Sequence, residues 1–216
     1  IDTIRFIHDE LKQVAAFGEL SLDITSRLNV TGGIRYFKYD KDVVGHTDVP
    51  SILVGARITP PTALSSSEDG TVVKANVSYK ITPDIMFYAE AAQGFRPGGV
   101  NQVLGLDTAL TPYRSDSLWN YEAGFKTAWL GRTLILNLDA FRIDWSNIQI
   151  TQRTPNGAFS YIGNASAARV QGIEFEGSLQ PVHGLNLNAN ATYMTAKLTE
   201  DVLPANLATA SSGLKG

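Results

Sequence analysis

Charged residues recur at alternate positions in this sequence, where they could bind a ligand or transfer protons. Glu174 and Glu176 are two residues apart, and Glu122 and Lys126 are four apart. Glycosidases use two nearby carboxyl groups as general acid and general base. In a strand, however, residues of equal parity share one face, so a ladder of charges on a wet sheet surface gives the same pattern. We favour the ladder, with ligand contact as the functional alternative.

Two arginines follow the same logic as the carboxylates. Arg35 lies in the segment Gly32–Phe37, and Arg96 follows Gly94-Phe95 at the end of an alternating run. Arg96 borders a predicted loop, which makes it the better ligand-contact candidate. The six candidate contact residues are Arg35, Arg96, Glu122, Lys126, Glu174 and Glu176.

Other site chemistries find no support in the sequence. There is no cysteine, and the three histidines, at positions 8, 46 and 183, are too scattered to suggest a metal site. The acidic residues at 40–48 do not have EF-hand spacing. The Gly94–Gly99 run lacks a following helix for a nucleotide loop, and no serine lies in a Gly-x-Ser-x-Gly elbow. The net charge of −3 disfavours nucleic acid, so we expect no enzyme activity, metal or cofactor.

Period-two alternation predicts an all-β fold. Within 185–194, Leu185, Leu187 and Tyr193 share one face with two alanines, while three asparagines share the other. Asparagines suit a wet surface. About eight strands follow from such patterns, several longer than the usual ~5–6 residues: 13–25, 27–42, 70–81, 85–96, 115–130, 132–153, 158–180 and 184–198.

The connections between these strands alternate in length. Short turns are predicted at 25–27, 82–84, 130–131 and 181–184, and longer connections at 43–69, 97–114 and after 198, with a tight turn at 154–157 as the exception. The compositions of 63–70 and 205–216 predict mobile loops. This alternation is typical of an antiparallel transmembrane β-barrel with short periplasmic turns and longer extracellular loops.

Two further patterns concern strand geometry. Trp119 and Trp129 have equal parity and lie about 33 Å apart along a strand, or about 25 Å in height at a tilt of ~40°, which matches the spacing of the aromatic girdles of such barrels. Around 134–145 the phase is ambiguous, because Leu134 and Leu138 favour one face and Phe141 and Trp145 the other. A β-bulge could reconcile the two sets.

Four segments carry motifs in a characteristic order. These are Gly33–Tyr36 (Gly-x-Arg-Tyr), Gly94–Asn101 (Gly-Phe-Arg-x-Gly-Gly-x-Asn), the Tyr-Glu-x-Gly-x-Lys and Phe-x-x-Asp-x-x-Asn-Ile-Gln strands within 117–150, and Asn164–Glu176, ending Gly-x-Glu-x-Glu. Together, over about residues 15–200, they resemble the barrel of TonB-dependent outer-membrane receptors.

The resemblance implies a barrel of about 22 strands in the bacterial outer membrane, filled by a plug domain. It implies TonB-driven uptake of a scarce nutrient ligand such as a ferric siderophore, haem, cobalamin or a glycan. Outer-membrane lipid, the plug, TonB and the ligand are the implied partners, and the six candidates become ligand or plug contacts. We expect residues 1–216 to be a partial barrel without plug, closing strand or signal peptide.

Two other classes remain open at this stage. A soluble extracellular β-sandwich would pack one face of each strand into a protein core and fold without detergent. A small autonomous porin-like or esterase-type barrel would close by itself, and an esterase would need a convergent serine, histidine and carboxylate.

Overall fold

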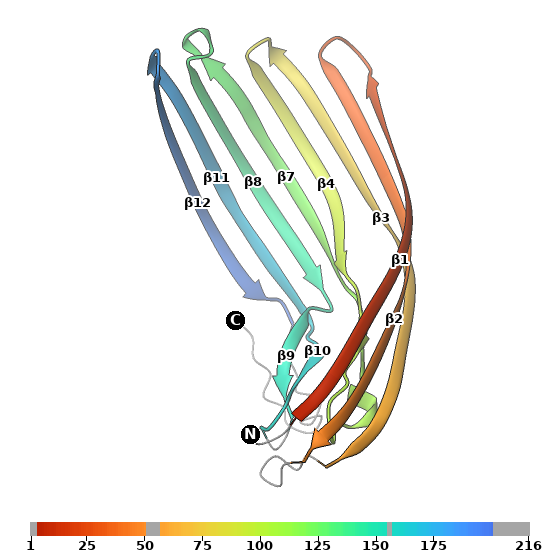
Figure 1. Ribbon diagram of the computed structural model, residues 1–216. Coiled ribbons are helices and arrows are strands. Elements are labelled where there is room, and N and C mark those ends of the chain that lie inside the picture. The colour runs from red at the N-terminus through yellow and green to blue at the C-terminus, as the bar shows by residue number, and fades with distance from the viewer. Residues whose placement is uncertain (1–3, 51–56, 155–156, 201–216) are drawn as a thin grey trace.

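The computed structural model describes residues 4–50, 57–154 and 157–200 as one curved antiparallel sheet with short elements at one end (Figure 1). The sheet has eight strands in the order β1-β2-β3-β4-β7-β8-β11-β12. Its strands are β1 (Ile4–Asp23), β2 (Leu28–Val49), β3 (Thr59–Thr82), β4 (Ile85–Arg96), β7 (Asp116–Trp129), β8 (Leu134–Ser146), β11 (Ala167–Val182) and β12 (Leu185–Leu198). Every sheet neighbour is also a neighbour in the order of these strands along the chain, as in a meander.

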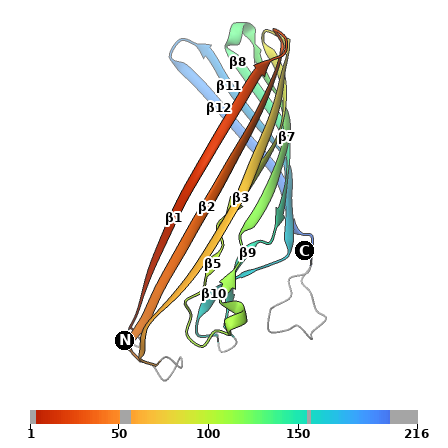
Figure 2. The same cartoon turned by 90° about the vertical axis from the view of Figure 1, so that its right-hand side faces the viewer.

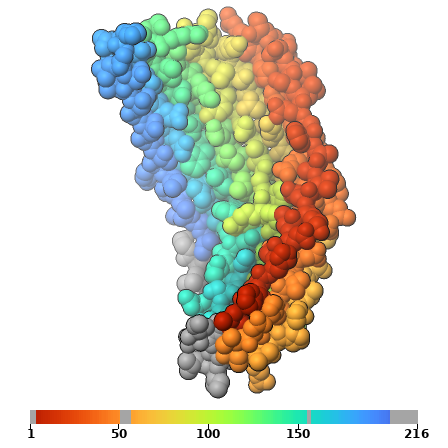
Figure 3. Space-filling view, viewed as in Figure 1, coloured from red at the N-terminus to blue at the C-terminus, as the bar shows by residue number. Residues whose placement is uncertain are grey.

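The sheet separates a polar concave face from an apolar convex face. Residues paired across strands share a face, and the register joins Asn76 to Glu90 and Glu90 to Glu122 on one side. It joins Val77 to Ala89 and Ala89 to Ala123 on the other. Figure 3 shows the concave side as a trough between β1 and β12. The predicted division of the strands into a polar and an apolar face is confirmed.

Short turns close one end of the sheet, as predicted. The β1–β2 turn is held by the Thr25 hydroxyl, which accepts hydrogen bonds from the backbone N–H groups of Arg27 (3.1 Å) and Leu28 (3.0 Å). Two residues separate β3 from β4, and two separate β11 from β12. The β7–β8 turn is the 3₁₀ element η2 (Leu130–Arg132), whose residues all have positive φ.

The opposite end differs from the sequence prediction. The predicted connection at 43–69 is wrong for most of its length, because β2 continues to Val49 and β3 begins at Thr59. The composition suggested a loop at 63–70, but these residues pair with β2 from Val44 to Phe37, and Gly70 lies against the Phe37 ring. A Cβ on Gly70 would lie 2.8 Å from Phe37 Cζ. The predicted loop at 205–216 lies outside the described residues.

Two predicted strands are each divided in two. The range 132–153 contains β8 and β9 (Gln149–Arg153), and 158–180 contains β10 (Ser160–Asn164) and β11. The break after β8 and the break before β11 lie side by side, because the Asn147 N–H donates to the Ser166 carbonyl at 2.8 Å. Asn147 has a positive φ of 53°. The pair β9–β10 thereby leaves the main sheet. The predicted tight turn at its tip carries a Gly157 N–H to Thr154 carbonyl bond of 2.7 Å.

The predicted β-bulge in 134–145 is absent. Strand β8 pairs without a register shift from Leu134 to Ser146 with both neighbours. Leu134 and Leu138 therefore face the convex side, and Phe141 and Trp145 the concave side. The apolar residues change faces because the concave wall becomes covered near the β9 end, where Arg96 lies over Trp145 at 4.8 Å.

The connection between β4 and β7, predicted at 97–114, is confirmed and is itself ordered. It contains β5 (Gly99–Val100), η1 (Thr108–Leu110) and β6 (Pro112–Tyr113), with β5 and β6 paired. We call residues 97–115 the rim segment. Figure 2 shows it beside β9 and β10 at the end of the sheet away from the short turns. Among the described residues, no helix is long and apolar enough to cross a membrane.

Candidate functional site

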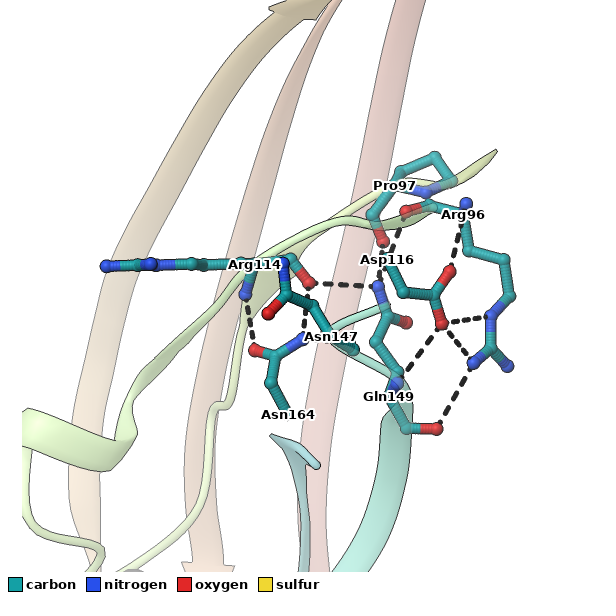
Figure 4. Close-up of polar contacts among 7 residues, drawn as sticks. All are labelled: Arg96, Pro97, Arg114, Asp116, Asn147, Gln149 and Asn164. Carbon is teal, nitrogen blue, oxygen red and sulfur yellow. Dashed lines mark hydrogen bonds and ion pairs between the residues drawn. The ribbon is translucent and has the colours of Figure 1, made fainter. Parts of the chain in front are cut away.

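The most buried carboxylate at this end organises the rim. Asp116, at the start of β7, is 1% exposed. It accepts hydrogen bonds from Arg96 Nε (2.8 Å), from Arg96 Nη2, from the Arg96 backbone N–H (3.2 Å) and from the Gln149 N–H (3.1 Å) (Figure 4). A buried charge is stable only when paired and hydrogen-bonded, and these donors meet that need. The Arg96–Asp116 ion pair joins β4 to β7, and the hydrogen bond from Gln149 adds β9.

Three amide side chains extend this cluster. Gln149 Nε2 donates to the carbonyls of Pro97 (2.9 Å) and Arg114 (3.1 Å). Asn164 accepts from the Arg114 N–H at 2.7 Å and donates to its carbonyl at 2.9 Å (Figure 4). Asn101, 7% exposed, exchanges hydrogen bonds with the backbone of Ile162 at 2.8 and 2.7 Å. We call Arg96, Asn101, Asp116, Gln149 and Asn164 the rim network.

A second anchor ties the rim segment to the long β2–β3 hairpin. The buried Tyr39 hydroxyl accepts from the Gly98 N–H at 2.7 Å and donates to Glu68, which also accepts from the Ser115 hydroxyl. Burial and the hydrogen bond to Glu68 raise the pKa of the Tyr39 phenol, so it keeps its proton and remains a donor. Gly98 must be glycine, since a Cβ there would lie 2.6 Å from the Tyr113 carbonyl oxygen.

Four of the six predicted contact residues lie on the concave wall of the last strands. The Glu122 carboxylate accepts from the Tyr88 hydroxyl at 2.6 Å, and Lys126 Nζ lies 5.2 Å from the centre of the Tyr88 ring. Tyr88 therefore links the two charges instead of a direct ion pair. Glu174 pairs across strands with Asp139, and Glu176 with Asn137, whose amide donates to it at 3.4 Å.

The two arginines lie apart from this group. Arg35 lies on β2 and donates to Gln13 at 3.2 Å, beside an open hollow of about 650 Å³ on the concave face of β1–β4. Arg96 is held in the rim network, so its guanidinium positions backbone. Among the described residues, no three His, Cys, Asp or Glu side chains converge to hold a metal ion.

The rim also carries an open pocket. It has a volume of about 540 Å³. Its lining comes from the rim segment and the β8–β11 breaks: Ala109, Pro112, Tyr113, Arg114, Asn147, Asn164, Ala165 and Ser166. Arg114 is exposed, while its backbone is fixed by Asn164 and Gln149.

Sequence reasoning missed most of the rim network as a site. It selected residues by charge and face, whereas the network uses amides that bond backbone. The motifs nevertheless contained its members: Asn101 ends the Gly-Phe-Arg motif, Gln149 ends the Asn-Ile-Gln motif, and Asn164 begins the Asn-Ala motif. Segments up to 61 residues apart thus meet at one end of the sheet.

Comparison with known proteins gives consistent relatives. The pesticin receptor of Yersinia enterocolitica is 26% identical over 190 residues, which cover 87% of this chain and 26% of that protein. The metal-pseudopaline receptor CntO of Pseudomonas aeruginosa is 25% identical over 194 residues, 90% of this chain and 25% of that one. The chain spans about a quarter of the length of these relatives.

Solved structures share the fold. The ferric yersiniabactin uptake receptor FyuA from Yersinia pestis superposes with a TM-score of 0.77 at 22% identity, covering 92% of this chain and 29% of that one. The copper transporter OprC superposes with a TM-score of 0.68 at 16% identity, covering 90% and 31%. The family model described as TonB dependent receptor-like, beta-barrel matches residues 3–213. The chain therefore belongs to the TonB-dependent receptor β-barrel family of the bacterial outer membrane.

Proposed function

We propose that this chain forms part of the wall of a larger closed barrel that imports a small nutrient ligand, such as a ferric siderophore or another metal chelate, across the outer membrane. The rim network is the observation that carries the proposal. It fixes a folded segment over the concave face at the end away from the short turns, where an incoming ligand would first meet the barrel. Relatives named as receptors for metal-pseudopaline and ferric yersiniabactin support this ligand class.

The concave wall supports a second part of the proposal. The concave face of β4, β7, β8 and β11 carries five carboxylates and a single lysine, Lys126. The carboxylates are those of Glu90, Glu122, Asp139, Glu174 and Glu176. Such an excess of carboxylates favours a basic partner. A plug domain of the same protein, facing the wall through arginine or lysine, would provide it, and TonB would drive uptake through that plug.

Ligand capture is assigned to the rim pocket. Arg114 presents a guanidinium from a backbone that three hydrogen bonds hold in place. A guanidinium suits carboxylate, catecholate or hydroxamate oxygens of an anionic chelate. The relatives' names indicate receptors and transporters, and a transport role needs no catalytic residue.

The test is energised uptake by the full-length receptor in cells that lack other TonB-dependent receptors. We expect radiolabelled iron to accumulate from at least one ferric siderophore, and to stop when TonB is removed. Arg114→Gln should weaken ligand binding, whereas Arg132→Gln, at the short turn where Arg132 pairs with Asp84 at 3.1 Å, should not. Equal uptake with and without TonB would overturn the proposal.

A further inference from the structure

The convex face is apolar along most of the last four strands. From the short-turn end it presents Phe125 and Ala123 on β7, Leu138 and Ala140 on β8, Phe175 and Ile173 on β11, and Tyr193 on β12. Leu138, Ile173 and Tyr193 are 51%, 52% and 71% exposed. In an outer-membrane barrel this face contacts lipid tails. Further toward the rim the same face becomes charged, with Arg142 on β8, Arg169 on β11 and Lys197 on β12.

The charges at this boundary are unevenly distributed around the sheet. On β1–β3 two convex lysines, Lys12 and Lys38, lie among four carboxylates: Glu10, Asp40, Asp42 and Asp69. On β8, β11 and β12 the balance is reversed. Three basic residues, Arg142, Arg169 and Lys197, accompany a single carboxylate, Asp144.

The basic residues form one cluster. Asp144 accepts from Arg142 Nε (2.9 Å) and Nη2 (2.8 Å), and from Arg169 Nε (2.7 Å). Lys197 pairs with Arg169 across β11 and β12. The side chains of Arg142 and Arg169 are 48% and 40% exposed. Each guanidinium has five N–H donors, so the bonds to Asp144 leave most of these donors for another acceptor.

Aromatic residues fix the level of this cluster in the membrane. Trp119 and Tyr121 stack with ring centroids 5.7 Å apart, and they pair across strands with Asp144 and Arg142. Tryptophan and tyrosine rings collect at the membrane–water interface, at the height of the lipid headgroups. The guanidinium groups therefore lie beside headgroups, on the outside of the barrel.

We propose that Arg142, Arg169 and Lys197 bind the phosphate groups of a lipid in the outer leaflet of the outer membrane. The forked guanidinium matches phosphate geometry with two parallel hydrogen bonds, and the cluster's excess positive charge complements an anionic headgroup. The site lies on the opposite face from the proposed ligand pocket. It rests on the proposed function only in placing these strands in the wall of a closed barrel.

The test measures retention of diphosphorylated lipid A by the purified full-length receptor in detergent, using native mass spectrometry. Each basic residue near a lipid surface changes the affinity about fivefold, so Arg142→Gln, Arg169→Gln and Lys197→Gln together should weaken retention roughly 100-fold. Asp144→Asn removes the only carboxylate of the cluster and should strengthen retention about fivefold. Lys38→Gln, a convex lysine among carboxylates, is the matched control and should leave retention unchanged.

Folding is checked separately by heat-modifiable gel mobility. If the triple variant fails to fold, Lys197→Gln and Asp144→Asn still predict opposite shifts in retention. Equal retention of lipid A and its dephosphorylated form, or weaker retention by Asp144→Asn, would overturn the lipid site. Loss of heat-modifiable mobility in the unaltered receptor would instead overturn the closed-barrel proposal.

Discussion

Replacing Asp116 with asparagine should loosen the rim without unfolding the barrel. The substitution keeps the shape and one acceptor oxygen, but it removes the charge that meets Arg96 and presents an NH₂ group to existing N–H donors. The strand ladders of β4, β7 and β8 do not depend on this side chain. The expected effect is therefore local opening of the rim segment, from residue 97 to residue 115.

The magnitude follows from the geometry. A hydrogen bond to a charged group contributes about 1.5–3 kcal/mol, and losing one partner of a fully buried pair costs about 3–5 kcal/mol. Because the Arg96 side chain is 48% exposed, water compensates part of its loss, which places the cost near 2 kcal/mol. That is a roughly 30-fold increase in the open population.

Amide hydrogen exchange of the full-length receptor in detergent measures this opening. The informative amides are those of Gly98, bonded to the Tyr39 hydroxyl, and Asn101, bonded to the Thr111 carbonyl at 2.7 Å. Both should exchange about 30-fold faster in Asp116→Asn when exchange follows the opening equilibrium. Arg35→Gln, which removes a wall hydrogen bond to Gln13, is the control and should leave them unchanged.

A double-mutant cycle sharpens the interpretation. Arg96→Gln alone strands a buried carboxylate, so adding Asp116→Asn should restore part of the protection, and the two effects should be less than additive. A change in exchange below about twofold for Asp116→Asn, which is within ordinary error, would refute the view that this ion pair holds the rim.

Three further predictions concern the anchor, the faces and the wall. Tyr39→Phe removes both hydrogen bonds of the hydroxyl and should cost about 1 kcal/mol locally, seen as roughly fivefold faster exchange at Gly98 with no change near Gly157. Leu138→Arg, on the convex face, should cost about 2–4 kcal/mol in barrel stability. Asn137→Arg, on the concave face opposite Glu176, should be tolerated. Urea titrations in lipid vesicles compare the two variants, and equal losses of stability would contradict the face assignment. Gly124→Ala should cost about 1–3 kcal/mol, since its Cβ would lie 2.6 Å from the Leu138 carbonyl oxygen, while Gly32→Ala, with nothing within 4 Å, should be neutral in the same titration.

Alternation alone was sufficient to predict the wall. The period of two assigns Leu187 and Asn188 to opposite faces wherever a strand pairs regularly, because neighbouring side chains of a strand point in opposite directions. The turns at Thr25 and Pro83-Asp84 were also readable, since their residues bond or restrict local backbone. The family motifs added the barrel class and its membrane.

Only the tertiary structure decided how the rim is built. Residues 63–70 have loop composition, yet they form strand because they pair along β2, where the Phe37 ring lies against Gly70. Asp116, Gln149 and Asn164 are unremarkable polar residues in the sequence. They become a site because breaks at Asn147 and Ser166 turn β9 and β10 inward, against the rim segment. Sequence determined the faces through local periodicity. Contacts between residues 20 to 61 positions apart determined the site, and periodicity carries no record of such contacts.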